Sequence, residues 1–195
     1  MKKFTIWMVL IGIVFSLVSC SKKEDSTIVD IENYTRISAK SIEELSTKLR
    51  NDPQITDPNS IILFAQNENL VLPSLVLKYV HYERYMDDNM QYDGRWSLNF
   101  YWGFDDGVLY HTEKIDLHLF YIPNGVDQSA TYSYTKDENS DLYTKEGMGN
   151  TKLYVFVIDQ FYYCDFVIEQ DVENMNDIVE RLSDFCKDVQ VLRNA

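Results

Sequence analysis

The sequence has 195 residues, of which 31 are acidic and 18 are basic, giving a formal net charge of −13. A field of this sign repels phosphate backbones, which disfavours nucleic-acid binding. It would attract a basic protein partner, although a role of the charge in solubility is the commoner case. The length is enough for one domain with a substantial core and is short for two.

The first twenty residues have a composition different from the rest. Lys2 and Lys3 precede an apolar run from residue 4 to residue 18, which is shorter than the roughly 20 residues of a membrane-spanning helix. These proportions are typical of a signal peptide. The segment ends Leu17-Val18-Ser19-Cys20 and resembles the lipobox of bacterial lipoproteins. The resemblance covers the leader only. It implies that residues 1–19 are removed and that Cys20 carries the lipid.

The residues after Cys20 bear on where such a lipoprotein would be anchored. Ser21 stands where enteric bacteria place the aspartate that retains lipoproteins at the inner membrane, so the resemblance implies the outer membrane. In Bacteroidota, acidic residues after the cysteine direct lipoproteins to the surface, whereas here Lys22 and Lys23 come first. The periplasmic face and the cell surface therefore remain alternatives.

Without the leader the chain holds 16 basic and 31 acidic residues, a formal charge of −15. This charge repels anionic lipid head groups, so acyl chains would have to hold the protein at a membrane. Residues 20–40 are polar and mixed in charge, and we expect a lipidated tether and domain entry. Residues 41–195 are expected to form a single α+β domain.

The first predicted elements are two helices and a strand. Ser41 and Glu44 form a capping-box pattern that predicts a helix over 42–51. A short apolar run at 61–65 predicts a buried strand. Residues 73–90 combine strand-forming residues with helical polar spacing and lack strict alternation. They are interpreted as a helix with Pro73 in its first turn.

The middle of the chain changes to a period of two. Large apolar residues alternate with smaller or polar ones over 95–104, which predicts a half-buried strand with Trp96 and Trp102 in the core. A hairpin turn at 105–107 and strands at 108–112, 115–122 and 129–135 follow, with an exposed loop at 136–141.

The C-terminal part predicts a sheet covered by a helix. Residues 153–158 are apolar on both faces, which is typical of a central strand, and a final strand is expected at 161–169. Asp171 is the expected cap of a long helix. Its apolar stripe consists of Met175, Ile178, Val179, Leu182, Phe185, Cys186 and Val189. The predicted fold class is α+β: a curved antiparallel sheet with a short N-terminal helix, a middle helix and a long C-terminal helix packed on it.

Two patterns bear on metal binding. His111, Glu113, Asp116 and His118 are close in sequence, but on one strand the first pair and the second pair point to opposite faces, so convergence needs a bulge. Asp137, Asn139 and Asp141 resemble half of a calcium loop, yet Leu142 and Met148 occupy its glycine and glutamate positions. We therefore predict no metal site and no cofactor.

The remaining candidate residues are aromatic side chains and cysteines. Tyr101 and Tyr134 are the aromatic residues retained as candidates for a binding surface. Cys164 and Cys186 are expected to lie close together if the last helix folds back over the last strand. A disulfide between them and two buried free thiols remain alternatives.

No nucleophile paired with a base, zinc-protease motif or glycine-rich phosphate loop is present. The leading hypothesis is a non-catalytic, lipid-anchored binding or interaction protein of the cell envelope. A sharper version is an acidic immunity or inhibitor-type protein that captures a basic partner. The alternative is an envelope enzyme whose carboxylates are brought together by the fold.

Overall fold

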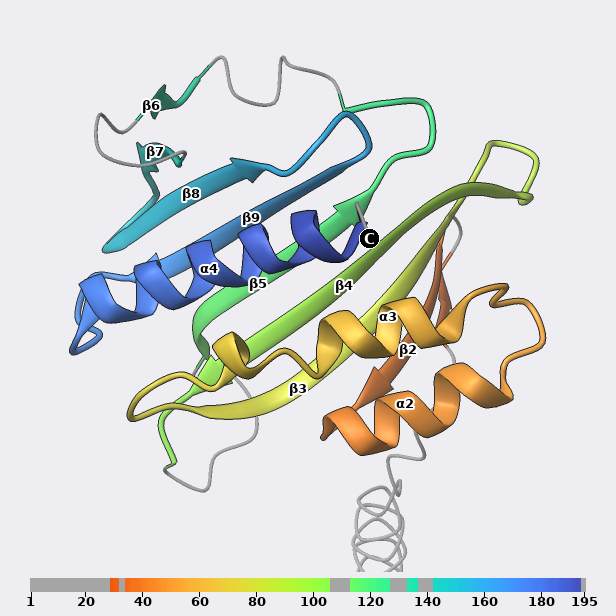
Figure 1. Ribbon diagram of the computed structural model, residues 1–195, viewed down its shortest axis with the longest axis horizontal. Coiled ribbons are helices and arrows are strands. Elements are labelled where there is room, and N and C mark those ends of the chain that lie inside the picture. The colour runs from red at the N-terminus through yellow and green to blue at the C-terminus, as the bar shows by residue number, and fades with distance from the viewer. Residues whose placement is uncertain (1–28, 32–33, 106–112, 127–132, 137–141, 194–195) are drawn as a thin grey trace, which may run out of the picture.

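The computed structural model describes residues 29–31, 34–105, 113–126, 133–136 and 142–193. Within these ranges the chain forms one open antiparallel sheet with helices on a single face (Figure 1). The predicted α+β class is confirmed. The elements in chain order are β1 (Val29–Ile31), β2 (Tyr34–Ala39), α2 (Ile42–Asn51), α3 (Pro58–Ala65), the 3₁₀ turn η1 (Glu68–Leu70), β3 (Val76–Met86), β4 (Tyr92–Gly103), β5 (Glu113–Tyr121), β6 (Thr135–Lys136), β7 (Tyr143–Glu146), β8 (Thr151–Val157), β9 (Tyr162–Glu169) and α4 (Met175–Arg193).

The nine described strands follow the order β1-β2-β3-β4-β5-β9-β8-β7-β6. Strands β1 to β5 form one meander in chain order, and β6 to β9 form a second meander in reverse order. The two meanders join where β5 pairs with β9, with Leu117 opposite Phe166 and Leu119 opposite Cys164. The folded sheet therefore begins before residue 41, because β1 and β2 are paired into it.

The core lies between the sheet and the helices. In β4, Leu98 and Phe100 have no exposed surface, and Trp102 is 1% exposed. Trp96 is 8% exposed, so the prediction that both tryptophans are core residues is confirmed. Phe104, predicted to share this face, is 37% exposed because β4 ends at Gly103.

The long C-terminal helix is confirmed, but its predicted cap is wrong. Helix α4 begins at Met175 and buries its predicted stripe against the sheet, with Met175 and Val179 partly buried at its border. The Asp171 carboxylate lies 3.1 Å from Lys114 Nζ and forms an ion pair. It is therefore bound to β5 and does not cap the helix.

The prediction of a strand at 61–65 is wrong, because these residues belong to helix α3. Asp57 caps this helix by accepting a hydrogen bond from the Ser60 amide at 3.2 Å, and Pro58 occupies its first turn. An apolar run this short fits a buried helix as well as a buried strand. The pair Asp57-Pro58 is a helix start signal and decides the assignment.

The predicted middle helix at 73–90 is also wrong, because residues 76–86 form strand β3. The pairing of β3 with β4 shifts register between Leu77 and Tyr79 and again between Arg84 and Met86. Each irregularity interrupts the alternation of buried and exposed residues. The sequence consequently lacks a period of two over this stretch, although the strand is long.

Several other predictions agree with the structure. Helix α2 has the predicted bounds, and the Ser41 hydroxyl accepts from the Glu44 amide at 3.2 Å. Strand β8 buries three successive side chains, and β9 alternates regularly. The predicted strand at 108–112 lies outside the described residues. Of the predicted strand at 129–135, residues 133–135 are described, and of these Thr135 alone is in a strand, β6. Of the predicted loop at 136–141, Lys136 is described and belongs to β6, so the prediction is wrong at this residue. No helix in the described ranges has the length and apolar character needed to cross a membrane.

Candidate functional site

The face of the sheet opposite the three described α-helices is the candidate site, and we call it the open face (Figure 1). Its side chains alternate along each strand with those of the core. Its central members, contributed by β2, β3, β4, β5 and β9, are Arg36, Ser38, Tyr79, His81, Glu83, Ser97, Asn99, Tyr101, Asp116, His118, Phe120, Tyr163 and Asp165. The face combines aromatic and titratable side chains.

One row of polar residues runs across five strands of the open face. Strand register places Ser38, His81, Asn99, His118 and Asp165 in successive opposed positions. His81 Nδ1 lies 2.7 Å from the Ser38 hydroxyl, and His118 Nδ1 lies 2.8 Å from Asp165 Oδ1. In each histidine, the Nδ1 atom makes its contact on the side away from Asn99. Asn99 lies between the two histidines.

Asn99 is the least solvated member of this row. Its side chain is buried, with 4% of the residue exposed, and its Oδ1 atom has no hydrogen-bond partner among the described residues. An unpaired buried acceptor costs about 1–3 kcal/mol relative to a paired one. The centre of the open face therefore contains a buried hydrogen-bond acceptor.

Aromatic rings pack beside the polar row. Tyr79 and Tyr101 stack with ring centroids 4.5 Å apart, and Tyr101 also contacts the rings of His81 and His118 at 5.3 and 5.8 Å. Phe120 stacks on Tyr163 at 4.7 Å. Tyr101, a candidate from the sequence, thus lies at the centre of the open face.

The carboxylates of the open face outnumber its cations. Glu83 is paired with Arg36, whose Nε lies 2.5 Å from Glu83 Oε1. Asp116 and Asp165 add two carboxyl groups. Glu113 adds another at the start of β5, where it accepts from the Tyr79 hydroxyl at 2.5 Å. A shift of register between β4 and β5 at this end accompanies that contact.

The titration behaviour of the face follows from its packing. Burial raises the pKa of Asp116 to about 6, an effect that the nearby His118 opposes. Burial disfavours the charged form of His118, but its hydrogen bond to Asp165 and the charges of Asp165 and Asp116 outweigh this, and the net result is a raised pKa. Burial, together with Arg36 and His118, lowers the pKa of His81 to about 4. Such clustering of shifted pKa values is typical of functional surfaces.

Residues from the two metal patterns are found in different environments. Asp116 and His118 share the open face, and Glu113 is engaged by Tyr79. His111 and residues 137–141 lie outside the described residues. Within the described part of the chain, no three or more His, Cys, Asp or Glu side chains are grouped so that they could hold a metal ion.

Tyr134, the second aromatic candidate, lies beside β7 and not within a strand. Lys145 Nζ lies 5.7 Å from the centroid of its ring. Burial raises the pKa of Tyr134, and the charge of Asp165 adds to this effect, which puts Tyr134 within electrostatic reach of the polar row. Tyr101 therefore lies at the centre of the open face, and Tyr134 lies toward the β7 side of the same surface.

The predicted proximity of Cys164 and Cys186 is present in the structure. Both residues are fully buried and free. Burial raises the pKa of the Cys164 thiol well above its usual value, and a hydrogen bond with Cys186 adds to the effect. The two sulfur atoms are thus in contact between β9 and α4. A disulfide formed on oxidation stays a prediction.

Sequence reasoning missed most of the polar row. Part of the row could be predicted within a single strand. His81 and Glu83 are two residues apart and therefore share a face, and the same holds for Asp116 and His118. Asn99 and Asp165 join them only through strand register, which requires the order β3-β4-β5-β9. No protein-family model matches the sequence, and no curated protein and no solved structure was found to be similar to it.

Proposed function

We propose that this chain is a non-catalytic, lipid-anchored binding protein of the cell envelope that binds a basic protein partner through the open face of its sheet. The lipobox-like segment ending at Cys20 supports the anchor. The observation that carries the binding role is the open face itself. It presents four carboxyl groups, from Glu83, Glu113, Asp116 and Asp165, near the guanidinium of Arg36, which is paired with Glu83. Arg95 and Lys114 lie on the same face, and each of them is paired with a carboxylate.

The chemistry of the open face favours lysine and arginine side chains of a partner. Carboxylates attract them and speed the encounter, while tyrosine rings offer cation–π contacts. Asn99 Oδ1 is an acceptor without a partner among the described residues, and a bound ammonium or guanidinium group could donate to it. An immunity or inhibitor-type role against a basic effector is the most specific form of this proposal.

Site-specific photo-crosslinking in cells tests the proposal. A benzophenone amino acid is placed at Tyr101 or Tyr163 on the open face, and at Leu63, which is 50% exposed on α3, as the control position. We expect adducts from the open-face positions with a protein of basic isoelectric point, and none from position 63. Adducts only from position 63, or an acidic partner, would contradict the proposal.

A charge-matched pair of variants tests the role of the carboxylates. Asp116→Asn with Asp165→Asn removes two charges from the open face. Asp177→Asn with Asp184→Asn removes two from the surface of α4, where these side chains are 52% and 44% exposed. We expect the first pair to abolish the adduct at position 101 and the second to leave it unchanged. Equal effects would mean that only net charge matters.

The second candidate function is catalysis by the same residues. Asp116, with its pKa of about 6, lies diagonally across from Asp165, which is hydrogen-bonded to His118. Two carboxyl groups in different environments can serve as acid and base. Incubating the protein with isolated envelope glycan and assaying released reducing ends tests this use. Release that Asp116→Asn abolishes would favour the enzyme.

A further inference from the structure

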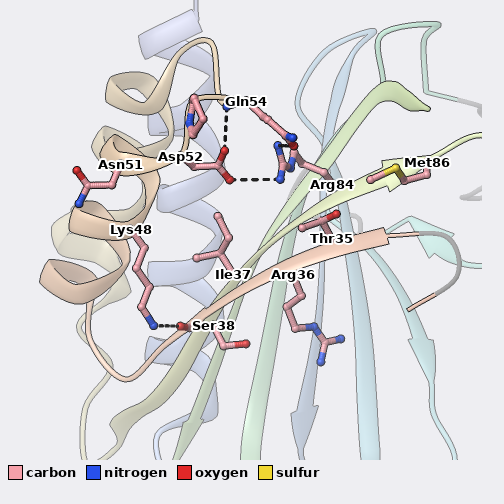
Figure 2. Close-up of a pocket in the computed structure, with 11 residues that line it drawn as sticks. Thr35, Arg36, Ile37, Ser38, Lys48, Asn51, Asp52, Gln54, Arg84 and Met86 are labelled. Atoms are coloured by element: carbon pink, nitrogen blue, oxygen red, sulfur yellow. Dashed lines mark hydrogen bonds and ion pairs between the residues drawn. The ribbon is translucent and has the colours of Figure 1, made fainter. Parts of the chain in front are cut away.

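A cavity of about 610 Å³ lies between α2 and the β2 edge of the sheet (Figure 2). Its volume is typical of small-molecule sites, which range over about 300–1,000 Å³. Helix α2 and the segment after it form one wall, and β2 with the end of β3 forms the other. Among the lining residues are Ile37, Lys48, Asp52, Gln54, Arg84 and Met86.

Arg84 is the most unusual residue in this lining. It is 4% exposed, and its guanidinium donates to Gln54 Oε1 at 2.7 Å and to Asp52 Oδ2 at 3.2 Å. Its Nε atom is buried and has no partner among the described residues. Asp52 thus accepts a hydrogen bond from one guanidinium nitrogen at a long distance. On the edge of the guanidinium group that carries Nε, the Nε atom lacks a hydrogen-bond partner among the described residues. Carboxylate and phosphate groups fill that edge with two parallel hydrogen bonds.

Lys48 supplies a second cation to the cavity. Its ammonium group donates to the Ser38 carbonyl at 2.7 Å and pairs with Glu44 at 2.8 Å. An ammonium group has three N–H donors, so one further hydrogen bond can be made. Lys48 and Arg84 thus line the cavity together with one acidic residue, Asp52, in a chain where acidic residues predominate. Arg36 lines the cavity from β2, but its guanidinium is paired with Glu83 on the open face.

The remaining walls of the cavity are partly apolar. Ile37 points from β2 toward α2, and Met86 lies near the outer end of the opening (Figure 2). Pro53 covers the same space from the loop. We propose that this cavity binds a small organic anion whose carboxylate or phosphoryl head is held by Arg84 and Lys48 and whose short apolar body contacts Ile37 and Met86. The four side chains proposed to hold the anion are not members of the open face, and the proposal does not rest on the proposed function.

Calorimetric titration of the full-length protein in nonionic detergent tests the proposal. Hexanoate and hexyl phosphate serve as the anionic probes, and hexanamide is the neutral probe of similar shape. The variants are Arg84→Lys, which keeps the charge but loses the fork, and Lys48→Met. Arg50→Met is the matched control, because Arg50 is exposed on the same helix and does not line the cavity.

The wild-type protein should bind at least one anionic probe and bind hexanamide far more weakly. Arg84→Lys should weaken that binding about tenfold to a hundredfold, as the loss of a charged hydrogen bond does. Lys48→Met should weaken it and Arg50→Met should not. Whichever anion binds more tightly identifies the head group. Equal binding of hexanamide, no binding at millimolar concentration, or unchanged binding by folded Lys48→Met would overturn the proposal.

Discussion

Asp116 shows how a single side chain on the open face links packing to pH dependence. Its pKa in the folded protein, about 6, lies above its usual value of 3.8 because the residue is partly buried. Between these two values the folded state holds a proton that the unfolded state has released. The contribution of Asp116 to stability therefore falls as the pH rises from about 4 to about 6, and it stays low above that range.

We predict that Asp116→Asn raises the free energy of unfolding at pH 7, by at most about 3 kcal/mol, since each pKa unit corresponds to about 1.4 kcal/mol. The gain should shrink as the pH falls through about 6 and vanish below about pH 3, where the aspartate is protonated in both states. Urea unfolding of both proteins over this pH range measures it. Asp165→Asn is the control and should destabilise, because it removes the hydrogen bond to His118. A destabilised Asp116→Asn at pH 7 would contradict this account.

The cysteine pair gives a second prediction at the same scale. Because Cys164 and Cys186 are buried and the pKa of Cys164 is raised, neither thiol should react with an alkylating reagent at about pH 8 in the folded protein. Two thiols should react after unfolding without reductant, as counted by mass spectrometry. If unfolded, unreduced protein shows no reactive thiol, the pair is oxidised and the disulfide alternative holds.

At the scale of elements, α4 provides much of the helical cover of the sheet. Leu182 has no exposed surface and lies in the stripe that packs on the sheet, whereas Val191 on the same helix is 66% exposed. We predict that Leu182→Ala lowers the free energy of unfolding by about 2–5 kcal/mol, the usual cost of such a cavity. Val191→Ala is the matched control and should change it by less than about 0.5 kcal/mol. Similar denaturation midpoints for the two variants would mean that α4 is not firmly packed.

The elements differ in how far the sequence could predict them. Helix α2, strand β4 and helix α4 have regular periods, because each presents one continuous face to the core. Strand β3 could not be predicted, since its register shifts hide the alternation. Helix α3 is short, and its apolar run 61–65 fits a strand as well as a helix, so the cap at Asp57 is the local signal that distinguishes them. The open face depends on pairing between β5 and β9, and local patterns contain no information on such distant contacts.

At the scale of the whole molecule, the prediction that matters most concerns the anchor. If Cys20 carries the lipid, Cys20→Ser should move the protein from the membrane fraction to the soluble fraction. Ser19→Ala retains a small residue before the cysteine and is the control that should stay with membranes. Cell fractionation with mass spectrometry of the N-terminus measures both. Membrane association of Cys20→Ser together with an unlipidated wild-type N-terminus would contradict the proposal.

The pairing of β5 with β9 has a consequence for the time at which this protein can fold. A chain exported with its N-terminus first delivers β1 to β5 long before β9 and α4 emerge. Until then the core face of β4 and β5 has no α4 to cover it, and β5 is an unpaired edge. The core between the sheet and α4, and the pairing of β5 with β9, can therefore form only after the last strand and helix of the chain have been made.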